Sequence, residues 1–106
     1  MNYQVYTCTL TQPAGENPVV NVLENQLDGT VEWTANGNGT VIGTLAGAFP
    51  QGKTKVLFTP DANNGPAHIS AGREDNDRVS VSAMNLAGAG LDGLFNDTLV
   101  EIRVYY

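Results

Sequence analysis

Apolar and polar residues alternate along most of this chain, in short runs that turn-forming residues separate. In one run Tyr6, Cys8 and Leu10 alternate with threonines, and near the end of the sequence Val100 and Ile102 flank a glutamate. Alternation with a period of two is typical of β-strands that bury one face. No stretch shows the period of an amphipathic helix. The pattern predicts seven or eight short strands, at residues 3–12, 19–25, 30–35, 40–45, 54–59, 67–71 (the weakest), 78–84 and 98–105.

Glycine, proline, asparagine and aspartate mark the turns between these runs. Asp28 and Gly29 stand between two apolar runs, where the positive φ of a tight hairpin turn favours such a pair. The sequence Asn-Gly-Asn-Gly at 36–39 marks the next turn. We therefore expect an antiparallel meander over about residues 19–45. The whole pattern predicts an all-β chain, a single antiparallel β-sandwich or jelly-roll-like barrel that spans residues 1–106.

The alternation also predicts which side chains are buried. Trp33 and Phe58 fall on the inward faces of their strands, so we expect both to be buried and the fluorescence of Trp33 to be blue-shifted. Cys8 is the only cysteine, which excludes an internal disulfide. Because it lies on an apolar face, we expect a small buried side chain with a raised pKa and little reactivity.

The charge balance narrows the choice of partners. The chain has five Lys and Arg against eleven Asp and Glu, for a net charge of −6, and its first basic residue is Lys53. Nucleic acids and anionic membrane surfaces are bound through clustered cations, so neither is an expected partner. The N-terminal residues lack the charged and apolar regions of a secretion signal. We expect a protein that is made and kept in a cytoplasm, or assembled there into something larger.

Candidates for catalysis are few. His68 is the only histidine, and no Gly-x-Ser-x-Gly sequence marks a nucleophile. Most carboxylates are spread one to a loop, whereas a glycosidase needs two that face each other across a cleft. We therefore expect no catalytic residue and no cofactor. A small hydrolase that uses His68 with a carboxylate remains a third, less favoured hypothesis.

The acidic turn near residue 75 is the one candidate for a calcium site, because hard cations take several oxygen ligands from flexible loops. Two arginines flank the turn and are expected to neutralise it, and no distal glutamate completes an EF-hand pattern. A solvated turn without metal is the favoured interpretation. If calcium did bind, its ligands would be Asp61, Asp75, Asn76 and Asp77.

The predicted connection at 85–97 is rich in glycine and alanine and yet contains large apolar residues. One interpretation is that it folds back to plug an open end of its own sandwich. The favoured one is that it packs against a neighbouring copy of the chain, since soluble proteins rarely leave apolar patches of this size exposed. The predicted contact residues of such a homo-oligomer are Leu86, Leu91, Leu94 and Phe95.

One part of the sequence is similar to a known group of proteins. The similar residues are Leu10-Thr11-Gln12, Pro18, Val22-Leu23-Glu24-Asn25, Leu27, Gly29-Thr30-Val31, Trp33, Gly39 and Gly43-Thr44-Leu45-Ala46-Gly47-Ala48-Phe49. Over about residues 3–60 the chain resembles small, mostly uncharacterised all-β proteins encoded among the structural genes of bacteriophages and prophages of Bacteroidetes-type bacteria. The shared residues mark a hairpin framework, so they transfer no functional residue. The resemblance implies a virion-associated head decoration, fibre or tail protein, a trimer, with other virion proteins as partners.

Two hypotheses follow for the function. The leading one is a non-enzymatic structural or assembly module of a phage particle, located in the virion. The alternative is a carbohydrate- or receptor-binding module that stacks sugars on exposed aromatic rings. Capsid or tail genes beside this gene would favour the first, and glycan binding would favour the second. The candidate stacking residues are Tyr3, Tyr105 and Tyr106.

Overall fold

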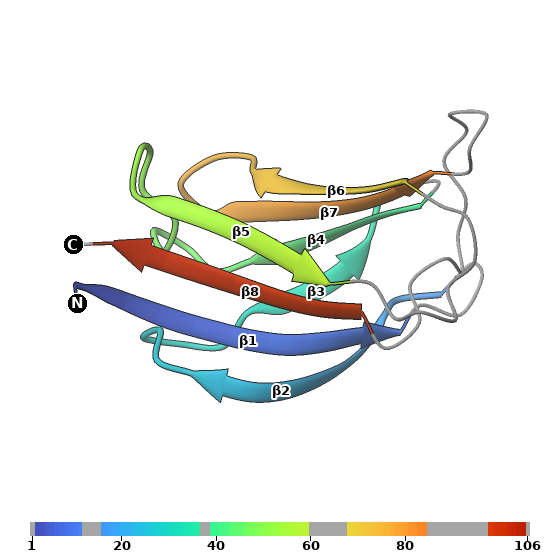
Figure 1. The fold of residues 1–106 in the computed structure, drawn as a ribbon, viewed down its shortest axis with the longest axis horizontal. Helices are drawn as coiled ribbons and strands as arrows, with labels where there is room; N and C mark the ends of the chain where they lie inside the picture. Colours follow the sequence, from blue (N-terminus) through green and yellow to red (C-terminus); the bar gives the residue numbers. More distant parts are fainter. Residues whose placement is uncertain (1, 12–15, 37–38, 60–67, 85–97, 106) are drawn as a thin grey trace.

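The computed structural model describes residues 2–11, 16–36, 39–59, 68–84 and 98–105, with the backbone alone at 68, 69, 83 and 84. Eight strands and no helix occupy the described residues (Figure 1). The strands are β1 (Tyr3–Thr11), β2 (Val19–Asn25), β3 (Glu32–Ala35), β4 (Thr40–Thr44), β5 (Thr54–Thr59), β6 (His68–Arg73), β7 (Arg78–Met84) and β8 (Thr98–Tyr105).

The strands form two antiparallel sheets that face each other in a sandwich-like arrangement (Figure 1). Sheet A has the strand order β2-β1-β8-β5, and sheet B has the order β3-β4-β7-β6. The all-β, antiparallel prediction is confirmed. The barrel alternative is wrong, because β5 and β6 lie beside each other without pairing and no strand pair joins the two sheets in the described part of the chain.

The predicted meander over residues 19–45 is also wrong. β2 pairs with β1 in sheet A, whereas β3 pairs with β4 in sheet B. The segment around Gly29, whose φ is 137°, therefore crosses between the sheets. The reason is that Leu27 and Val31, on either side of this segment, are both buried in the core. The Asn25 side chain stabilises the crossing, since its Oδ1 accepts from the Leu27 amide at 2.9 Å and its Nδ2 donates to the Gly29 carbonyl at 2.9 Å.

The core lies between the sheets and consists mainly of alternate residues of the paired strands, together with Leu27, Val31 and Phe49 from the connections. Trp33 is buried, as predicted, and its Nε1 donates to the Tyr6 hydroxyl at 3.1 Å. This buried bond links β3 of sheet B to β1 of sheet A. The fully buried members of the core are Tyr6, Cys8, Leu10, Val41, Phe49, Val79, Val81, Val100 and Ile102.

Phe58 is only half-buried, so the prediction that it belongs to the buried core is wrong. Its strand, β5, is at the edge of sheet A, and Phe58 lies opposite the buried Val100 on the inward face, where this edge leaves it partly open to solvent. Alternation identifies the inward face of a strand, but an edge strand has core neighbours on one side alone.

The connection between β4 and β5 closes one end of the sandwich. Phe49 lies in this connection and is fully buried. Its amide donates to the Asn76 carbonyl at 2.9 Å, and its carbonyl accepts from Arg73 Nε at 2.7 Å. The Asp77 carbonyl accepts from the Leu45 amide at 2.8 Å. The connection is therefore fastened to the turn between β6 and β7.

Gly43 is the place where the absence of a side chain matters most for packing. A Cβ built there would lie 3.0 Å from two ring atoms of Trp33 and 3.0 Å from a methyl group of Val31. We expect Gly43→Ala to lower the free energy of unfolding by about 1–3 kcal/mol, because the rigid indole cannot yield and overpacked cores lose about this much. Urea unfolding measures the loss. Gly72→Ala is the control, since a Cβ at Gly72 meets nothing within 4 Å, and equal stability of the two variants would contradict the packing seen here.

Candidate functional site

The outer face of sheet A brings together residues from both ends of the sequence. Tyr3 on β1 lies opposite Tyr105 on β8, and Val5 lies opposite Arg103. Arg103 in turn lies opposite Lys55 on β5. Since Tyr6, Cys8, Ile102 and Val104 fill the inward face of the same strands, these residues share the face that points to solvent.

Two of the three predicted stacking residues form a compact group on this face. The ring centroids of Tyr3 and Tyr105 are 5.0 Å apart, with 45° between the ring planes. The Arg103 guanidinium lies over the Tyr3 ring, 5.1 Å from its centroid, and its Nε bonds Glu101 Oε2 at 2.5 Å. Hydrogen bonds to Glu101 and then to Tyr105 raise the pKa of Arg103, so the group keeps its positive charge. Tyr106 lies outside the described residues.

A hollow of about 400 Å³ opens beside Tyr105. Gln4, Asp28 and Lys53 contribute polar groups to its lining, and Leu27, Pro50 and Tyr105 contribute apolar surface. Small-molecule sites occupy about 300–1,000 Å³ and combine apolar surface with a few polar groups. The size and lining of this hollow are compatible with one or two sugar rings.

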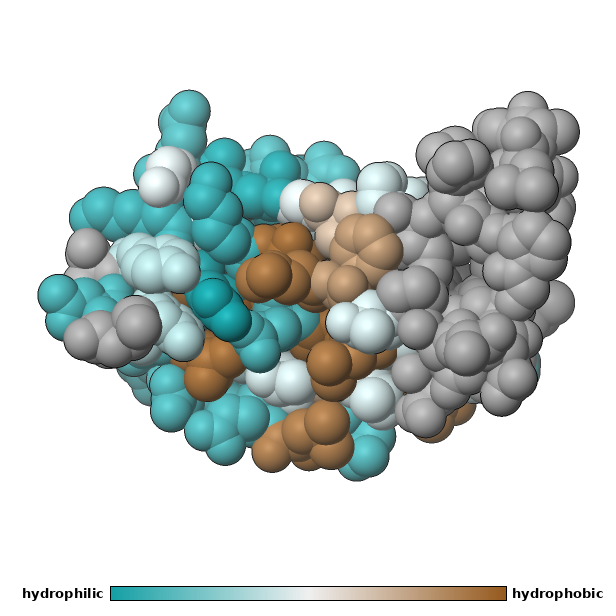
Figure 2. All heavy atoms as spheres, in the orientation of Figure 1, coloured by the Kyte–Doolittle hydropathy of each residue, from teal (hydrophilic) through white to brown (hydrophobic). Residues whose placement is uncertain are grey.

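The edge strand β2 exposes more apolar side chain than any other described strand. Val19, Val22 and Leu23 are 64%, 48% and 55% exposed. The register with β1 shifts between Thr7 and Cys8, which is a β-bulge. In the described part of the chain β2 pairs with β1 alone. Figure 2 shows apolar surface along this lower edge and in the centre of the face over β5 and β8. An exposed apolar edge strand is a template for pairing with another chain.

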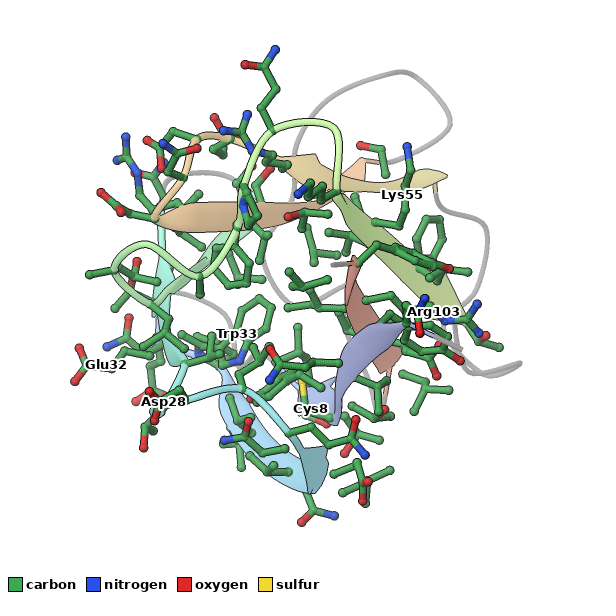
Figure 3. The ribbon with its side chains drawn as sticks, turned by 90° about the vertical axis from the view of Figure 1, so that its left-hand side faces the viewer. Cys8, Asp28, Glu32, Trp33, Lys55 and Arg103 are labelled. Carbon is green, nitrogen blue, oxygen red and sulfur yellow. The ribbon has the colours of Figure 1, made fainter. Side chains whose placement is uncertain are left out.

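Charge is separated across the sandwich. Residues 16–36 contain Glu16, Glu24, Asp28 and Glu32 and no Lys or Arg. Lys53, Lys55 and Arg103 belong to the opposite, β5–β8 side of sheet A. Figure 3, an end-on view, shows Lys55 and Arg103 on one flank and Asp28 and Glu32 on the other. Among the described residues, the side that carries residues 16–36 is therefore acidic. On the other side Lys53 and Lys55 leave a small positive excess, because Glu101 pairs with Arg103, and Asp28 and Lys53 meet at the hollow beside Tyr105.

In the acidic turn between β6 and β7, the side chains of Asp75 and Asp77 already bond to other groups of the protein. Arg78 Nη2 is 2.6 Å from Asp75 Oδ2, and Asp77 Oδ1 accepts from the Gly47 amide at 2.8 Å. The hydrogen bond from Arg78 lowers the pKa of Asp75. Neutralisation by Arg78 is confirmed, whereas Arg73 Nη2 bonds the neutral Asn76 at 2.6 Å instead of a carboxylate. Among the described residues no group of three His, Cys, Asp or Glu side chains is placed to hold a metal, and Asp61 lies outside them.

Cys8 is fully buried beside Tyr6, as the alternation predicts. Burial raises the pKa of the Cys8 thiol to about 11, even though a hydrogen bond with Tyr6 acts in the opposite direction. Burial also raises the pKa of the Tyr6 hydroxyl to about 12, against the hydrogen bond from Trp33. Both groups are neutral at physiological pH, so they belong to the core and supply no nucleophile.

We expect this buried pair to make stability fall at alkaline pH. Between pH 9 and 11 the folded state keeps a proton on Cys8 that the unfolded chain loses. Through Cys8, each pH unit in that window lowers the free energy of unfolding by about 1.4 kcal/mol, and below the window this contribution is fully present. Above pH 10.0 the raised pKa of Tyr6 adds a further loss. Urea unfolding across the window measures this slope, and Ellman's reagent is expected to react with Cys8 only after unfolding.

Cys8→Ala is the control for that prediction. In this variant the alkaline loss should begin about one pH unit later, where Tyr6 starts to titrate from its ordinary pKa of 10.0. Identical pH profiles for the two proteins, or rapid reaction of the native thiol, would contradict the burial of Cys8.

The remaining candidates are not positioned by the described residues. His68 begins β6, where the backbone alone is described. The predicted oligomer contacts Leu86, Leu91, Leu94 and Phe95 lie outside the described residues. The β2 edge and the hollow beside Tyr105 were not predicted. A signal for the edge is present at residues 19–23, where apolar residues fall on both faces of the strand.

Comparisons with known proteins identify no relative of this chain. No family model, curated protein or solved structure matches this chain. No helix among the described residues is long and apolar enough to cross a membrane.

Proposed function

We propose that this protein is a non-enzymatic structural module that assembles into a larger particle, in the virion of a bacteriophage. The observation that carries the proposal is the edge strand β2, whose Val19, Val22 and Leu23 are about half exposed or more. Charges, prolines, β-bulges or a covering segment normally prevent pairing at such an edge, and β2 has one carboxylate, Glu24, and one bulge beside its three exposed apolar side chains. The carboxylates of residues 16–36 and the cations Lys55 and Arg103 also lie on different sides of the molecule, so the acidic side of one copy can face the cations of another.

The finer parts of this proposal rest on the resemblance over residues 3–60. It favours a head decoration, fibre or tail protein. It also favours a trimeric assembly and a sandwich of the jelly-roll type. Neither sheet shows the strand order 4-1-2-3 of a Greek key within itself, so the jelly-roll assignment depends on how the strands connect between the sheets. Other virion proteins are the proposed partners, with no role for nucleic acid or membrane.

Light scattering tests the assembly. The single chain has a mass of 11.2 kDa, and we expect a larger mass that grows as the protein is concentrated. A mass that stays at the single-chain value up to millimolar concentration would overturn the proposal. Capsid or tail genes on either side of this gene would support the phage assignment, and a neighbourhood of metabolic genes would count against it.

A carbohydrate-binding module is the second candidate, and the pairing of Tyr3 with Tyr105 beside the hollow favours it. Tyr105 is 36% exposed and lines the hollow together with the polar residues Gln4, Asp28 and Lys53. A glycan array tests this function. Binding that is lost in Tyr105→Ala and kept in Leu57→Ala, an exposed residue elsewhere on the same face, would support it. An array without binding would exclude it for the glycans displayed.

A further inference from the structure

We propose that copies of this chain associate head to tail in sheet A, with the β2 edge of one copy paired to the β5 edge of the next. The inference rests on the proposed assembly function and specifies how the copies meet. The two strands are the opposite edges of the same sheet, whose order is β2-β1-β8-β5. A contact between two different edges is heterologous and repeats from copy to copy, so it builds a ring or a filament.

Strand direction permits this pairing. β2 and β8 both run antiparallel to β1, and β5 runs antiparallel to β8. β2 and β5 therefore run in opposite directions, and a second copy placed beside the first by a translation and a rotation continues the antiparallel alternation. Within the described residues β2 pairs with β1 alone and β5 with β8 alone. β5 also contacts β6 of sheet B, without pairing to it.

The outward-facing side chains of the two edges are complementary. Glu24 lies opposite Thr7 of β1, and Lys55 lies opposite Arg103 of β8, which places both on the outer face of sheet A. Both residues are exposed. A register that sets Glu24 beside Lys55 of the next copy brings Asn21 beside Leu57, provided that the bulge at Leu23 takes up one residue of β2 as it does against β1. Opposite charges in directly facing positions stabilise an antiparallel pair, and like charges destabilise it.

Charge also selects this contact over the symmetric alternative. A two-fold dimer through β2 would bring together two copies of the acidic side, which has four carboxylates and no cation between residues 16 and 36. The head-to-tail contact sets the same side against Lys53 and Lys55 and covers the apolar residues of β2 with those of the β5 edge.

Charge reversal tests the contact, read out by sedimentation velocity over a dilution series. Glu24→Lys and Lys55→Glu each place like charges at every junction, so each variant alone should associate roughly tenfold more weakly than the wild type. In an equimolar mixture, every junction between the two different variants has opposite charges again, so the mixture should recover association, as should the double variant. Glu74→Lys has the same change of charge on the exposed turn between β6 and β7 and should leave association unchanged. Circular dichroism verifies that each variant is folded.

The outcomes separate the two proposals. A wild-type protein that remains a single chain overturns the assembly function and this inference with it. An assembly that neither reversal weakens, or that the mixture fails to recover, overturns the β2–β5 contact alone. If Glu24→Lys weakens association and Lys55→Glu has no effect, β2 contacts a surface other than β5, and the β2–β5 contact is again overturned. Should either charged variant fail to fold, Glu24→Gln and Lys55→Gln provide the same comparison with a smaller loss.

Discussion

Replacing Trp33 by alanine is expected to lower the free energy of unfolding by about 3–5 kcal/mol, which is the usual cost of removing a large buried aromatic side chain. Trp33 is buried between the sheets, and its Nε1 bonds the Tyr6 hydroxyl at 3.1 Å. The substitution therefore opens a cavity and leaves a buried hydroxyl without this partner. Because small domains are stable by about 5–15 kcal/mol, the variant loses a large share of its stability.

Urea unfolding followed by circular dichroism measures this loss, and the emission of Trp33 in the wild type should be blue-shifted until the chain unfolds. Tyr105→Ala is the matched control, an aromatic truncation at a residue that is 36% exposed, and it should cost far less. A Trp33→Ala variant as stable as this control would mean that the faces of β3 are reversed, since a shift of one residue exchanges them.

The strands and their faces were predictable because one local rule governs both. Four strands, β2, β5, β7 and β8, begin and end where the alternation predicts, and the others differ by one or two residues at an end. Alternation also identified Tyr6, Cys8 and Leu10 as one buried face. Each prediction depends only on residues within the same strand, where the period of two operates directly.

The arrangement of the strands was less predictable because it depends on contacts between distant residues. An Asp-Gly pair between apolar runs indicates a hairpin on local grounds, and here the burial of Leu27 and Val31 overrides that preference. The pairs β1–β8, β5–β8 and β4–β7 join strands far apart in the sequence, and no local signal specifies them. The edge positions of β2 and β5 follow from these pairs, which is why neither the exposure of β2 nor that of Phe58 was predicted.

The candidate site was also predictable only in part, because the sequence indicates single residues but not which of them the strand pairing brings together. Tyr3 and Tyr105 were chosen as exposed aromatic residues near the two ends of the chain, and the register of β1 with β8 brings them within 5.0 Å. Arg103 and Glu101 were not chosen, because their role on this face arises from that register. The charge separation was visible in part, as an absence of cations before Lys53, but its meaning depends on β2 and β5 being opposite edges of one sheet.

Phe49 shows how a buried residue escapes a search for alternation, and its substitution has the second large expected effect. It lies in the connection between β4 and β5, outside any strand, and yet it is fully buried. Both of its backbone polar groups are bonded, the amide to the Asn76 carbonyl and the carbonyl to Arg73 Nε at 2.7 Å. The ring thus fills the end of the core while the backbone is held to the neighbouring turn.

We expect Phe49→Ala to lower the free energy of unfolding by about 3–5 kcal/mol, because the cavity opens where strands of both sheets end and the connection cannot collapse into it while its backbone is fastened. Phe49→Leu retains most of the volume and is the matched control, with an expected loss of about 1.5 kcal/mol or less. Urea unfolding of the two variants beside the wild type gives both values. Equal, small losses would mean that the end of the sandwich closes by other contacts and that the hydrogen bonds to Asn76 and Arg73, rather than the ring, hold this connection in place.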